Sequence, residues 1–301
     1  MEQYKIIFAG LANAGKTSIT LTLQRQFSDL ADITPTKGID RTELDILGFR
    51  VVNWDLGGQE IFREEYKKKE AVIFAETEIL FYVIDIQDTD LYEDALKYLQ
   101  DIVEIYKSVD PDRLPYTTIC LNKVDPDLMI DFSKQTKELS SKIANILKGL
   151  EYKIFQTSIY NLPSLIEAFS WGIAKFLPKQ SELDLMLKKF LAEHANVNAV
   201  NLLEKHSMFL IQSYRDESAQ LFFNLLKEGI ISIIEKLGNK LTVLTLDINK
   251  IFKVFVEKMT VLQRDYYFVF MGQDLDFDLI QNSLITNYYG QIQNIVQSEL
   301  Q

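Results

Sequence analysis

The chain has 301 residues, about the length of two average domains; 47% of the residues are apolar and 25% are charged. That composition is typical of a globular protein and excludes a disordered chain. No apolar run approaches the ~18 residues that a bilayer helix needs. The net charge of −11 argues against nucleic acid or anionic lipid as general partners, because both are bound through Lys and Arg.

Cysteine and histidine are too scarce for most metal or disulfide chemistry. The single cysteine, Cys120, lies in an apolar run, and we predict a buried strand position for it, which excludes a disulfide within one chain. The two histidines, His194 and His206, are too few to form a metal site by themselves. We find no signal-peptide pattern and no lipidation motif. We therefore expect a cytoplasmic protein without a direct membrane anchor, which partner proteins would recruit to a membrane surface.

Strand-like and helix-like segments alternate through the first part of the chain. The run 79–85 is apolar on both faces, which is typical of a central strand covered by helices on both sides. This alternation predicts an α/β domain with a mostly parallel central sheet and one antiparallel edge strand. Ligands of such sheets bind at the carboxyl ends of the strands. The predicted strands are 4–9, 43–47, 49–55, 79–85, 116–122 and 152–157, with a first helix at 16–26.

A second domain is predicted after Pro178, because proline disfavours helix at the residue before it. Residues 179–301 then form an α+β domain in which three closely spaced strands suit an antiparallel meander. We predict the aromatic clusters Phe222–Phe223 and Tyr266–Phe268 to be core. The predicted elements are helices at 181–194 and 219–237, strands at 208–214, 241–248, 251–258 and 265–271, and a final helix whose apolar face runs from 277 to 295.

The segment Gly10–Thr17 matches the pattern G-x-x-x-x-G-K-[ST] between a strand and a helix, which predicts a phosphate-binding loop. Its backbone N–H groups and the helix N-terminus would bind the β-phosphate. Lys16 would bridge the β- and γ-phosphates, and the hydroxyl of Thr17 would ligate Mg²⁺. The predicted nucleotide contacts of this loop are Gly10, Asn13, Ala14, Gly15, Lys16, Thr17 and Ser18.

The motif Asn122-Lys123-Val124-Asp125 predicts that the base is guanine. The carboxylate of Asp125 can accept from the N1–H and the 2-amino group of guanine, whereas adenine would leave that charged acceptor unpaired. Asn122 would support the loops, and the stem of Lys123 would pack over the ribose region. The segment 157–159 fits the loop whose backbone N–H contacts guanine O6, which makes Ser158 and Ile159 further predicted contacts.

Two segments between these motifs have the residues of nucleotide-dependent switches. Asp55 would hold Mg²⁺ through water, the Gly58 N–H would contact the γ-phosphate, and Gln59 would orient the attacking water. Upstream, Thr36 would ligate Mg²⁺ and the γ-phosphate only in the GTP state. The predicted catalytic residues are Lys16, Thr36 and Gln59, and the predicted Mg²⁺ ligands are Thr17, Thr36 and Asp55.

We predict slow intrinsic GTP hydrolysis from these residues. An arginine finger typically raises the hydrolysis rate by ~10³–10⁵-fold, and none is evident in the chain. Arg41 and Arg63 flank the switch segments, and we expect each to be solvated or to face a partner. We therefore expect that a separate activating protein is required.

The first domain resembles the Ras superfamily, and its motifs G-L-x-x-A-G-K-T, P-T-x-G and W-D-L-G-G-Q are close to the Arf type. The stretches 53–62 and 155–160 are more similar to the Rag/Gtr GTPases. Members of that family have a C-terminal roadblock (longin-like) domain of about this length and element order. The resemblance therefore implies a Ras-like GTPase domain over 1–178 and a roadblock-like dimerisation domain over 179–301. The unaltered N-K-x-D motif and the Arf-like P-T-K-G leave open a simpler, archaeal type of relative.

The resemblance also implies partners and a signalling role. It implies a homo- or heterodimer with a Rag-like GTPase through 179–301, roadblock-domain proteins, activating and exchange proteins, and effectors recruited according to the bound nucleotide. Two alternatives stay open. One is an Arf-like GTPase with an appended domain, although no amphipathic helix precedes the first strand. The other is a mainly structural, GTP-bound scaffold subunit, against which the presence of Thr36 and Gln59 argues.

Overall fold

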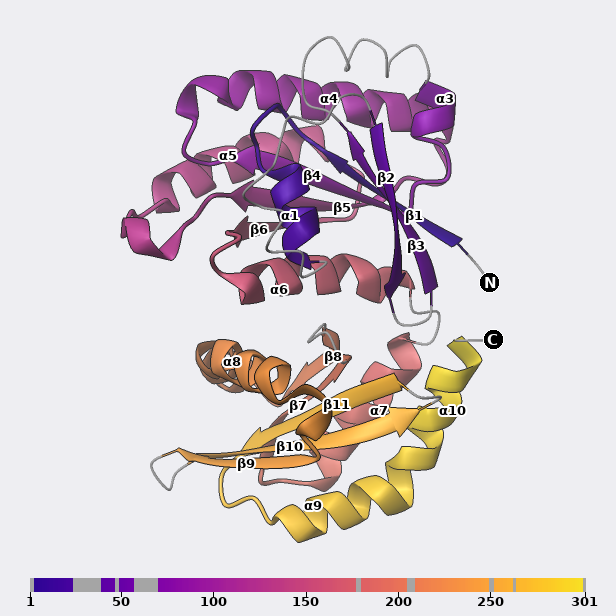
Figure 1. The fold of residues 1–301 in the computed structure, drawn as a ribbon, viewed down its shortest axis with the longest axis vertical. Helices are drawn as coiled ribbons and strands as arrows, with labels where there is room; N and C mark the ends of the chain where they lie inside the picture. Colours follow the sequence, from indigo (N-terminus) through magenta and orange to yellow (C-terminus); the bar gives the residue numbers. More distant parts are fainter. Residues whose placement is uncertain are drawn as a thin grey trace. The chain divides into compact units, whose positions relative to one another are not determined.

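The structure is a computed structural model that describes residues 3–23, 39–46, 49–56, 70–176, 180–204, 209–248, 252–261 and 264–299. The chain divides into two compact units, Met1–Gly172 and Ile173–Gln301, each with its own sheet (Figure 1). The division falls shortly before Pro178, the last residue of the predicted first domain, because the 3-10 turn η4 (Ala174–Phe176) belongs to the second unit.

The sheet of the first unit has the strand order β2-β3-β1-β4-β5-β6. All neighbours pair in parallel except β2 with β3, which confirms the predicted mostly parallel sheet with one antiparallel edge strand. The edge strand begins at Ile39, four residues before the predicted start at 43, because it pairs with β3 as far as Leu56. Its charged residues fit an edge position. The bounds are β1 Gln3–Ala9, β2 Ile39–Ile46, β3 Phe49–Leu56, β4 Ile79–Asp85, β5 Tyr116–Asn122 and β6 Tyr152–Thr157.

Helices cover both faces of this sheet, as the apolar pattern of β4 predicts. Leu80, Tyr82 and Ile84 join the core formed with α4 and α5, while Phe81 stacks on Phe169 of α6 at 5.3 Å between ring centroids. Figure 1 shows α4 and α6 on opposite sides of the strands. The bounds are α1 Lys16–Leu23, α3 Glu70–Ile73, α4 Tyr92–Val109, α5 Ser133–Ile146 and α6 Leu162–Ile173, with 3-10 turns η2 Thr89–Leu91 and η3 Pro126–Leu128.

The sheet of the second unit is antiparallel throughout, with the order β8-β7-β11-β10-β9. The strand β7 was not predicted, and the element order is therefore α-β-β-α-β-β-β-α. Two asparagines interrupt its apolar run, yet Asn201 is fully buried because β7 lies between β8 and β11. The bounds are β7 Val197–Glu204, β8 Phe209–Tyr214, β9 Val243–Ile248, β10 Phe252–Val261 and β11 Arg264–Gly272.

Helices also pack on both faces of this second sheet. Phe190 of α7 contacts Phe270 on one face at 5.2 Å between ring centroids, and Tyr267 on the other face donates from its hydroxyl to the Gly238 carbonyl at the end of α8, at 3.2 Å. Phe223 and Tyr266–Phe268 are buried as predicted, while Phe222 is only half-buried. The bounds are α7 Gln180–Glu193, α8 Glu217–Leu237, η5 Gly238–Lys240 and α9 Phe277–Ser283, followed by the π-helix η6 Leu284–Tyr289 and α10 Gly290–Glu299.

The last helix has the predicted apolar face but is not a uniform α-helix. Ile280, Leu284, Tyr288 and Ile292 are buried along it. The stretch Leu284–Tyr289 has the wider hydrogen bonding of a π-helix, which is a local departure that hydrophobic spacing does not predict.

One buried carboxylate in this unit is incompletely paired. Glu257 on β10 is 9% exposed; its Oε1 accepts from Gln281 Nε2 at 2.8 Å, while its Oε2 has no protein partner among the described residues. Burial is the main cause that raises the pKa of this carboxyl above its ordinary value. Because the folded pKa exceeds the unfolded one, ionisation of Glu257 lowers the free energy of unfolding as pH rises above the unfolded pKa.

We expect Glu257→Gln to stabilise the protein at pH 7.5 by roughly 1 kcal/mol, because an uncharged amide is less costly to bury with an unpaired oxygen. The gain should shrink as pH falls toward 4.5 and below, because the wild-type carboxyl, whose pKa is raised by burial, becomes protonated over that range. Denaturant unfolding of the full chain at several pH values measures the difference. Glu228→Gln on the exposed side of α8 is the matched control, and an equal effect from both variants would contradict the assignment to burial.

Candidate functional site

The loop between β1 and α1 requires glycine at two positions. Gly10 has φ of +145°, and a Cβ there would lie 2.2 Å from the Val83 carbonyl oxygen. Gly15 has φ of +99°, and a Cβ there would lie 2.4 Å from Asn122 Nδ2. Only glycine fits both the conformation and the close approach. Asn13, at φ of +61°, is also left-handed, as asparagine tolerates.

Lys16 begins α1, and its side chain folds back into this loop. The residue is 6% exposed, and its Nζ donates to the carbonyl oxygens of Gly10 at 3.1 Å and Leu11 at 2.9 Å. A buried ammonium group favours an anionic partner, and the N-terminus of α1 provides backbone donors at the same place. The glycine cradle and this lysine therefore fit a bound phosphate. Thr17 and Ser18 follow on α1 and are half-buried.

Asn122 at the end of β5 joins three loops. Its Nδ2 donates to the Ala14 carbonyl of the phosphate loop at 2.9 Å, and its Oδ1 accepts from the Thr157 hydroxyl at the end of β6 at 3.2 Å. The side chain is 2% exposed. Because β1, β5 and β6 run parallel in this sheet, their carboxyl ends meet at one edge, and the predicted contacts on these loops lie together there.

Asp125 is oriented by a hydroxyl from the neighbouring loop. Ser158 Oγ donates to Asp125 Oδ1 at 2.5 Å, and the Val124 N–H donates to the Thr157 carbonyl at 3.1 Å. The backbone N–H of Ser158 donates to Ser164 Oγ at 3.1 Å. Ser158 therefore supports the site through its hydroxyl, and the N–H of Ile159, the next residue of the turn, stays the predicted donor to guanine O6.

Lys123 is fixed by residues that sequence reasoning did not identify. Its Nζ pairs with Asp85 Oδ2 at 2.6 Å, and its backbone has φ of +69°. Gln87 donates from Nε2 to the Lys123 carbonyl at 2.7 Å, and its N–H donates to Asp85 Oδ1 at 3.0 Å. The stem of Lys123 is therefore held between β4 and β5. The only sequence signal was that Asp85 ends a buried strand.

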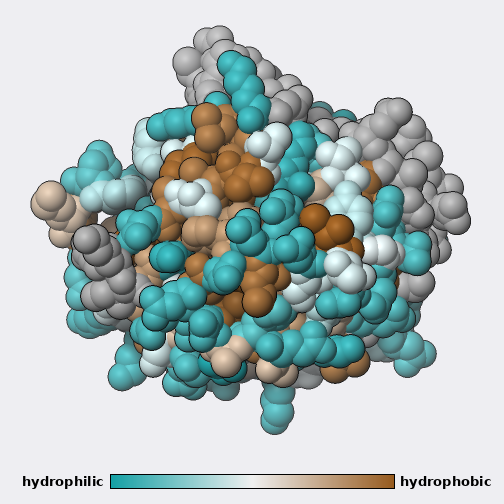
Figure 2. All heavy atoms as spheres, turned by 90° about the horizontal axis from the view of Figure 1, so that it is seen from below, coloured by the Kyte–Doolittle hydropathy of each residue, from teal (hydrophilic) through white to brown (hydrophobic). Residues whose placement is uncertain are grey.

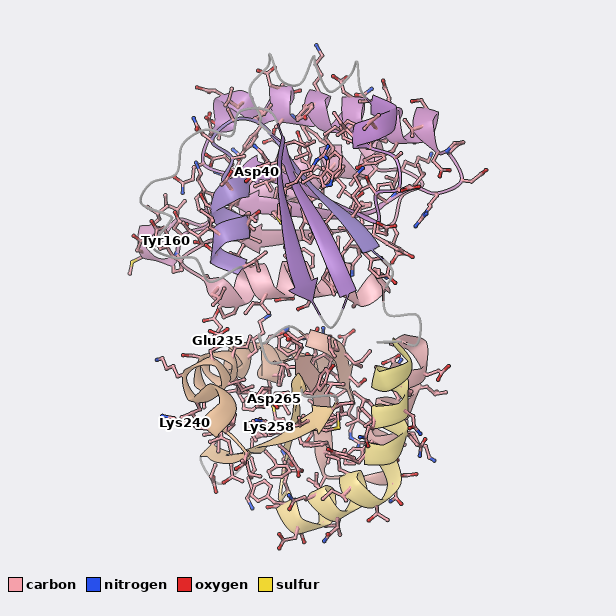
Figure 3. All side chains as sticks on the ribbon, turned by 45° about the vertical axis from the view of Figure 1, so that its right-hand side comes forward. Asp40, Tyr160, Glu235, Lys240, Lys258 and Asp265 are labelled. Atoms are coloured by element: carbon pink, nitrogen blue, oxygen red, sulfur yellow. The ribbon has the colours of Figure 1, made fainter. Side chains whose placement is uncertain are left out.

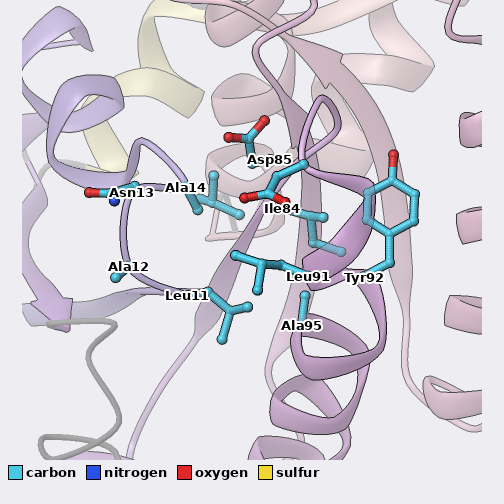
Figure 4. A pocket seen from close by; sticks show the side chains of 11 residues that line it. Leu11, Ala12, Asn13, Ala14, Ile84, Asp85, Leu91, Tyr92 and Ala95 are labelled. Carbon is cyan, nitrogen blue, oxygen red and sulfur yellow. The ribbon is translucent and has the colours of Figure 1, made fainter.

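A small hollow lies behind the phosphate loop. Figure 4 shows it between Leu11–Ala14 and the start of α4, with Asp85 and Tyr92 at its wall. Its other lining side chains are mainly apolar, and Asn122, Asp125 and Ser158 do not line it. Tyr92 donates from its hydroxyl to the Ile86 carbonyl at 2.5 Å. The hollow therefore belongs to the packing of the loop against α4 rather than to the base-binding edge.

Trp54, the residue before Asp55, contacts a cation from the strand on each side of β3. Lys5 Nζ lies 4.1 Å and Arg41 Cζ 3.7 Å from the ring centroid. Such contacts are attractive through the ring quadrupole. Burial and the charge of Arg41 lower the pKa of Lys5 to about 8. Arg41 thus packs on Trp54 in this structure.

Several predicted residues lie outside the described residues. These are Thr36, Gly58, Gln59 and Arg63, and also the side chain of Asp55, whose backbone pairs with Phe8 in the sheet. Their roles in hydrolysis and Mg²⁺ binding stay predictions. Of the predicted Mg²⁺ ligands, only Thr17 has a described side chain, and its place beside the glycine cradle fits that role.

Comparison with known proteins decides the family. Residues 5–236 match the sequence model of the Gtr1/RagA G protein conserved region, which is well over half of the chain. The chain belongs to the Gtr1/RagA family of G proteins. It is therefore a GTP-binding GTPase of the Rag/Gtr type, a family that binds GTP or GDP with Mg²⁺.

Individual relatives are distant. The GTP-binding protein GTR1 of Saccharomyces cerevisiae is 26% identical over 225 residues, covering 71% of this chain and 70% of the yeast protein. Ras-related GTP-binding protein B of Rattus norvegicus is 28% identical over 184 residues, covering 60% of this chain and 48% of the rat protein, so the chain spans about half the length of that relative. The ADP-ribosylation factor-like protein alp41 of Schizosaccharomyces pombe is 30% identical over 173 residues, covering 56% of this chain and 84% of alp41.

We expect Asp125→Asn to weaken GDP binding by roughly 100-fold, because a charge-assisted acceptor for two guanine donors is replaced by a neutral amide. The same variant should bind xanthosine diphosphate more tightly than the wild type does, since the Asn amide can donate to the 2-oxo group of xanthine. Competition titration of both nucleotides measures the change. Asp127→Asn, an exposed carboxylate two residues away, is the control, and an unchanged preference in Asp125→Asn would contradict the base-reading role.

Proposed function

We propose that this GTPase works as a molecular switch whose GTP state orders the segments around Thr36 and Gln59 and so recruits effectors. The proposal rests on hydrogen bonds among the loops of the site. Ser158 donates to Asp125, Asn122 donates to the phosphate loop, and that loop accepts from the buried Lys16. In this proposal, that network holds one guanine nucleotide. Loops that tighten on a γ-phosphate and relax without it can then act as a two-state element.

Hydrolysis in this proposal depends on positioning. Lys16 would bridge the β- and γ-phosphates, and Gln59 would orient the attacking water. Mg²⁺, held by Thr17, Thr36 and, through water, Asp55, would neutralise charge on the phosphates. Because Arg41 packs on Trp54, we propose that a separate activating protein supplies an arginine and that an exchange protein opens the site.

We expect Gln59→Leu to slow single-turnover GTP hydrolysis at least tenfold without weakening GDP binding, because this side chain would act on the water and not on the base or the α- and β-phosphates. A phosphate-release assay on protein preloaded with GTP measures the rate. Gln100→Leu, on the exposed side of α4, should leave the rate unchanged. An unaltered hydrolysis rate in Gln59→Leu, or bound nucleotide that never exchanges, would favour the scaffold alternative. Rapid hydrolysis by the purified wild-type chain would contradict the need for an activating protein.

We further propose that residues 179–301 are a roadblock-like domain that assembles with the same domain of a second copy or of another Rag-like GTPase. The support is an antiparallel sheet with helices on both faces, together with an incompletely covered apolar face. On this face, Leu244, Leu246 and Ile248 of the edge strand β9 are only half-buried. An edge strand also offers unpaired backbone groups to a partner.

Helix α8 extends the same apolar surface. Phe222 contacts Phe252 of β10 at 4.4 Å between ring centroids, while Leu221 and Leu225, one turn apart, are 68% and 79% exposed. Figure 2 shows apolar side chains gathered on a face of the second unit. Exposed apolar patches of this kind mark interaction sites. We define the surface of α8 and β9 as the assembly face.

A membrane-associated role would also depend on partners. In the described part of the chain, no helix is long and apolar enough to cross a bilayer. We propose a cytoplasmic protein that roadblock-domain partners recruit to a membrane surface, where it takes part in signalling.

We expect the full chain to be a dimer by light scattering with either GDP or a non-hydrolysable GTP analogue. The double variant Leu221→Glu/Leu225→Glu should be monomeric, because burying two carboxylates at the interface is costly. The control is Leu185→Glu. Leu185 is 70% exposed and lies on α7, which packs on the other face of the sheet, so this variant should stay dimeric. A dimer in all three proteins would contradict the assembly face, and a monomeric wild type that dimerises only with a second Rag-like GTPase would make the assembly heterodimeric.

A further inference from the structure

Tyr160 has an exposed aromatic ring, and it lies two residues after Ser158, whose hydroxyl orients the base-reading Asp125. It is 74% exposed, whereas most of the other aromatic side chains described in the first unit are buried. Its backbone N–H donates to Ser158 Oγ at 3.1 Å, and the same hydroxyl donates to Asp125 Oδ1 at 2.5 Å. One hydroxyl group therefore links the backbone of Tyr160 to the Asp125 carboxylate. Figure 3 shows Tyr160 at the outer left-hand edge of the first unit.

The turn that carries Tyr160 is held by several bonds. Ser158 and Asn161 form an isolated bridge, in which the Asn161 N–H donates to the Ser158 carbonyl at 3.1 Å. Ser164 Oγ donates to the Asn161 carbonyl at 2.6 Å and accepts the N–H of Ser158 at 3.1 Å. The backbone of Tyr160 is thus fixed from both sides, although its ring makes little contact with the protein. Because the backbone of this turn is already ordered, less conformational entropy is lost when a ligand binds against the Tyr160 ring.

Among the described residues of the base site, Asp125, Ser158 and Lys123 do not provide a planar apolar wall. Asp125 and the neighbouring N–H groups can recognise only the edge of guanine, and Lys123 offers an aliphatic stem. A purine also has two flat faces, which bind best to aromatic rings. We propose that the ring of Tyr160 stacks on the guanine base and thereby sets how long the nucleotide stays bound. This inference rests on the guanine site described above and adds a positioning residue to it.

The alternative is that the exposed ring of Tyr160 contacts a protein partner instead of the guanine base. Met129 and Ile130, which follow the base-reading motif, are also exposed apolar side chains, at 95% and 53%. The two readings differ in what they predict for the isolated chain. A partner contact would leave nucleotide binding by the purified protein unchanged when Tyr160 is truncated, whereas stacking would not.

The test is the dissociation rate of GDP from the preloaded full-length protein in Mg²⁺. We expect Tyr160→Ala to release GDP and a non-hydrolysable GTP analogue about 5- to 100-fold faster, by the same factor, because both share the base. Tyr160→Phe should stay within roughly twofold of wild type, since the ring is retained. Met129→Ala, which truncates another exposed apolar side chain of the same unit, is the control and should not change the rate.

A second measurement separates stacking from a loosened turn. With GDP labelled at C8 of the base, the H8 resonance of bound nucleotide should move upfield through the ring current in wild type and Tyr160→Phe, and lose that shift in Tyr160→Ala. Equal release rates and equal H8 shifts in wild type and Tyr160→Ala would overturn the inference. If the wild-type chain itself failed to retain GDP, the guanine site would be wrong; if it retained GDP and only the Tyr160 effects were missing, the stacking alone would be wrong.

Discussion

The buried amide of Asn122 is the interaction on which the rest of the nucleotide site depends. It bonds the phosphate loop at Ala14 and the following loop at Thr157, so that three strand ends act as one body. A buried amide that lost either partner would leave a polar group unpaired, at a cost of about 1–3 kcal/mol. Its position also explains why Gly15 has no side chain, since a Cβ there would occupy the place of Nδ2. The motif that reads the base is therefore also the support of the loop that binds phosphate.

The two sheets differ in how their strands pair and in what they expose. In the first, β4 is buried on both faces and brings Asp85 to the edge where Lys123 needs a partner. Parallel strands gather their carboxyl ends, which is why residues far apart in the chain converge there. In the second, antiparallel pairing leaves β9 at an edge and apolar side chains partly uncovered on α8. One unit thus gathers the nucleotide-binding residues at one sheet edge, and the other has the partly uncovered apolar face that we propose for assembly.

The family assignment and the structure support one another at different levels. The Gtr1/RagA match extends through residue 236 and so includes elements of both units, which the Arf-like alternative leaves unexplained. Further contacts support or flank the residues of the nucleotide site. Arg41 packs on Trp54, Asp85 and Gln87 fix Lys123, and the Ser158 hydroxyl links the backbone of Tyr160 to Asp125. Of these, only Tyr160 is proposed to set how long the nucleotide stays bound.

The sequence by itself determined the ligand-binding motifs and most of the elements, because glycine positions, N-K-x-D spacing and apolar runs act locally. It predicted the strands 79–85, 116–122 and 152–157 with their observed bounds. It did not predict β7, since Asn201 breaks the apolar pattern and is buried only by the strands on both sides of it. Nor did it identify Asp85, Gln87 or the hydroxyl of Ser158 as supports of the base-reading residues. Those roles are decided by tertiary structure, because hydrogen bonds between loops depend on which strand ends the sheet brings together. The strand order of the sheet cannot be predicted from any single segment of the sequence.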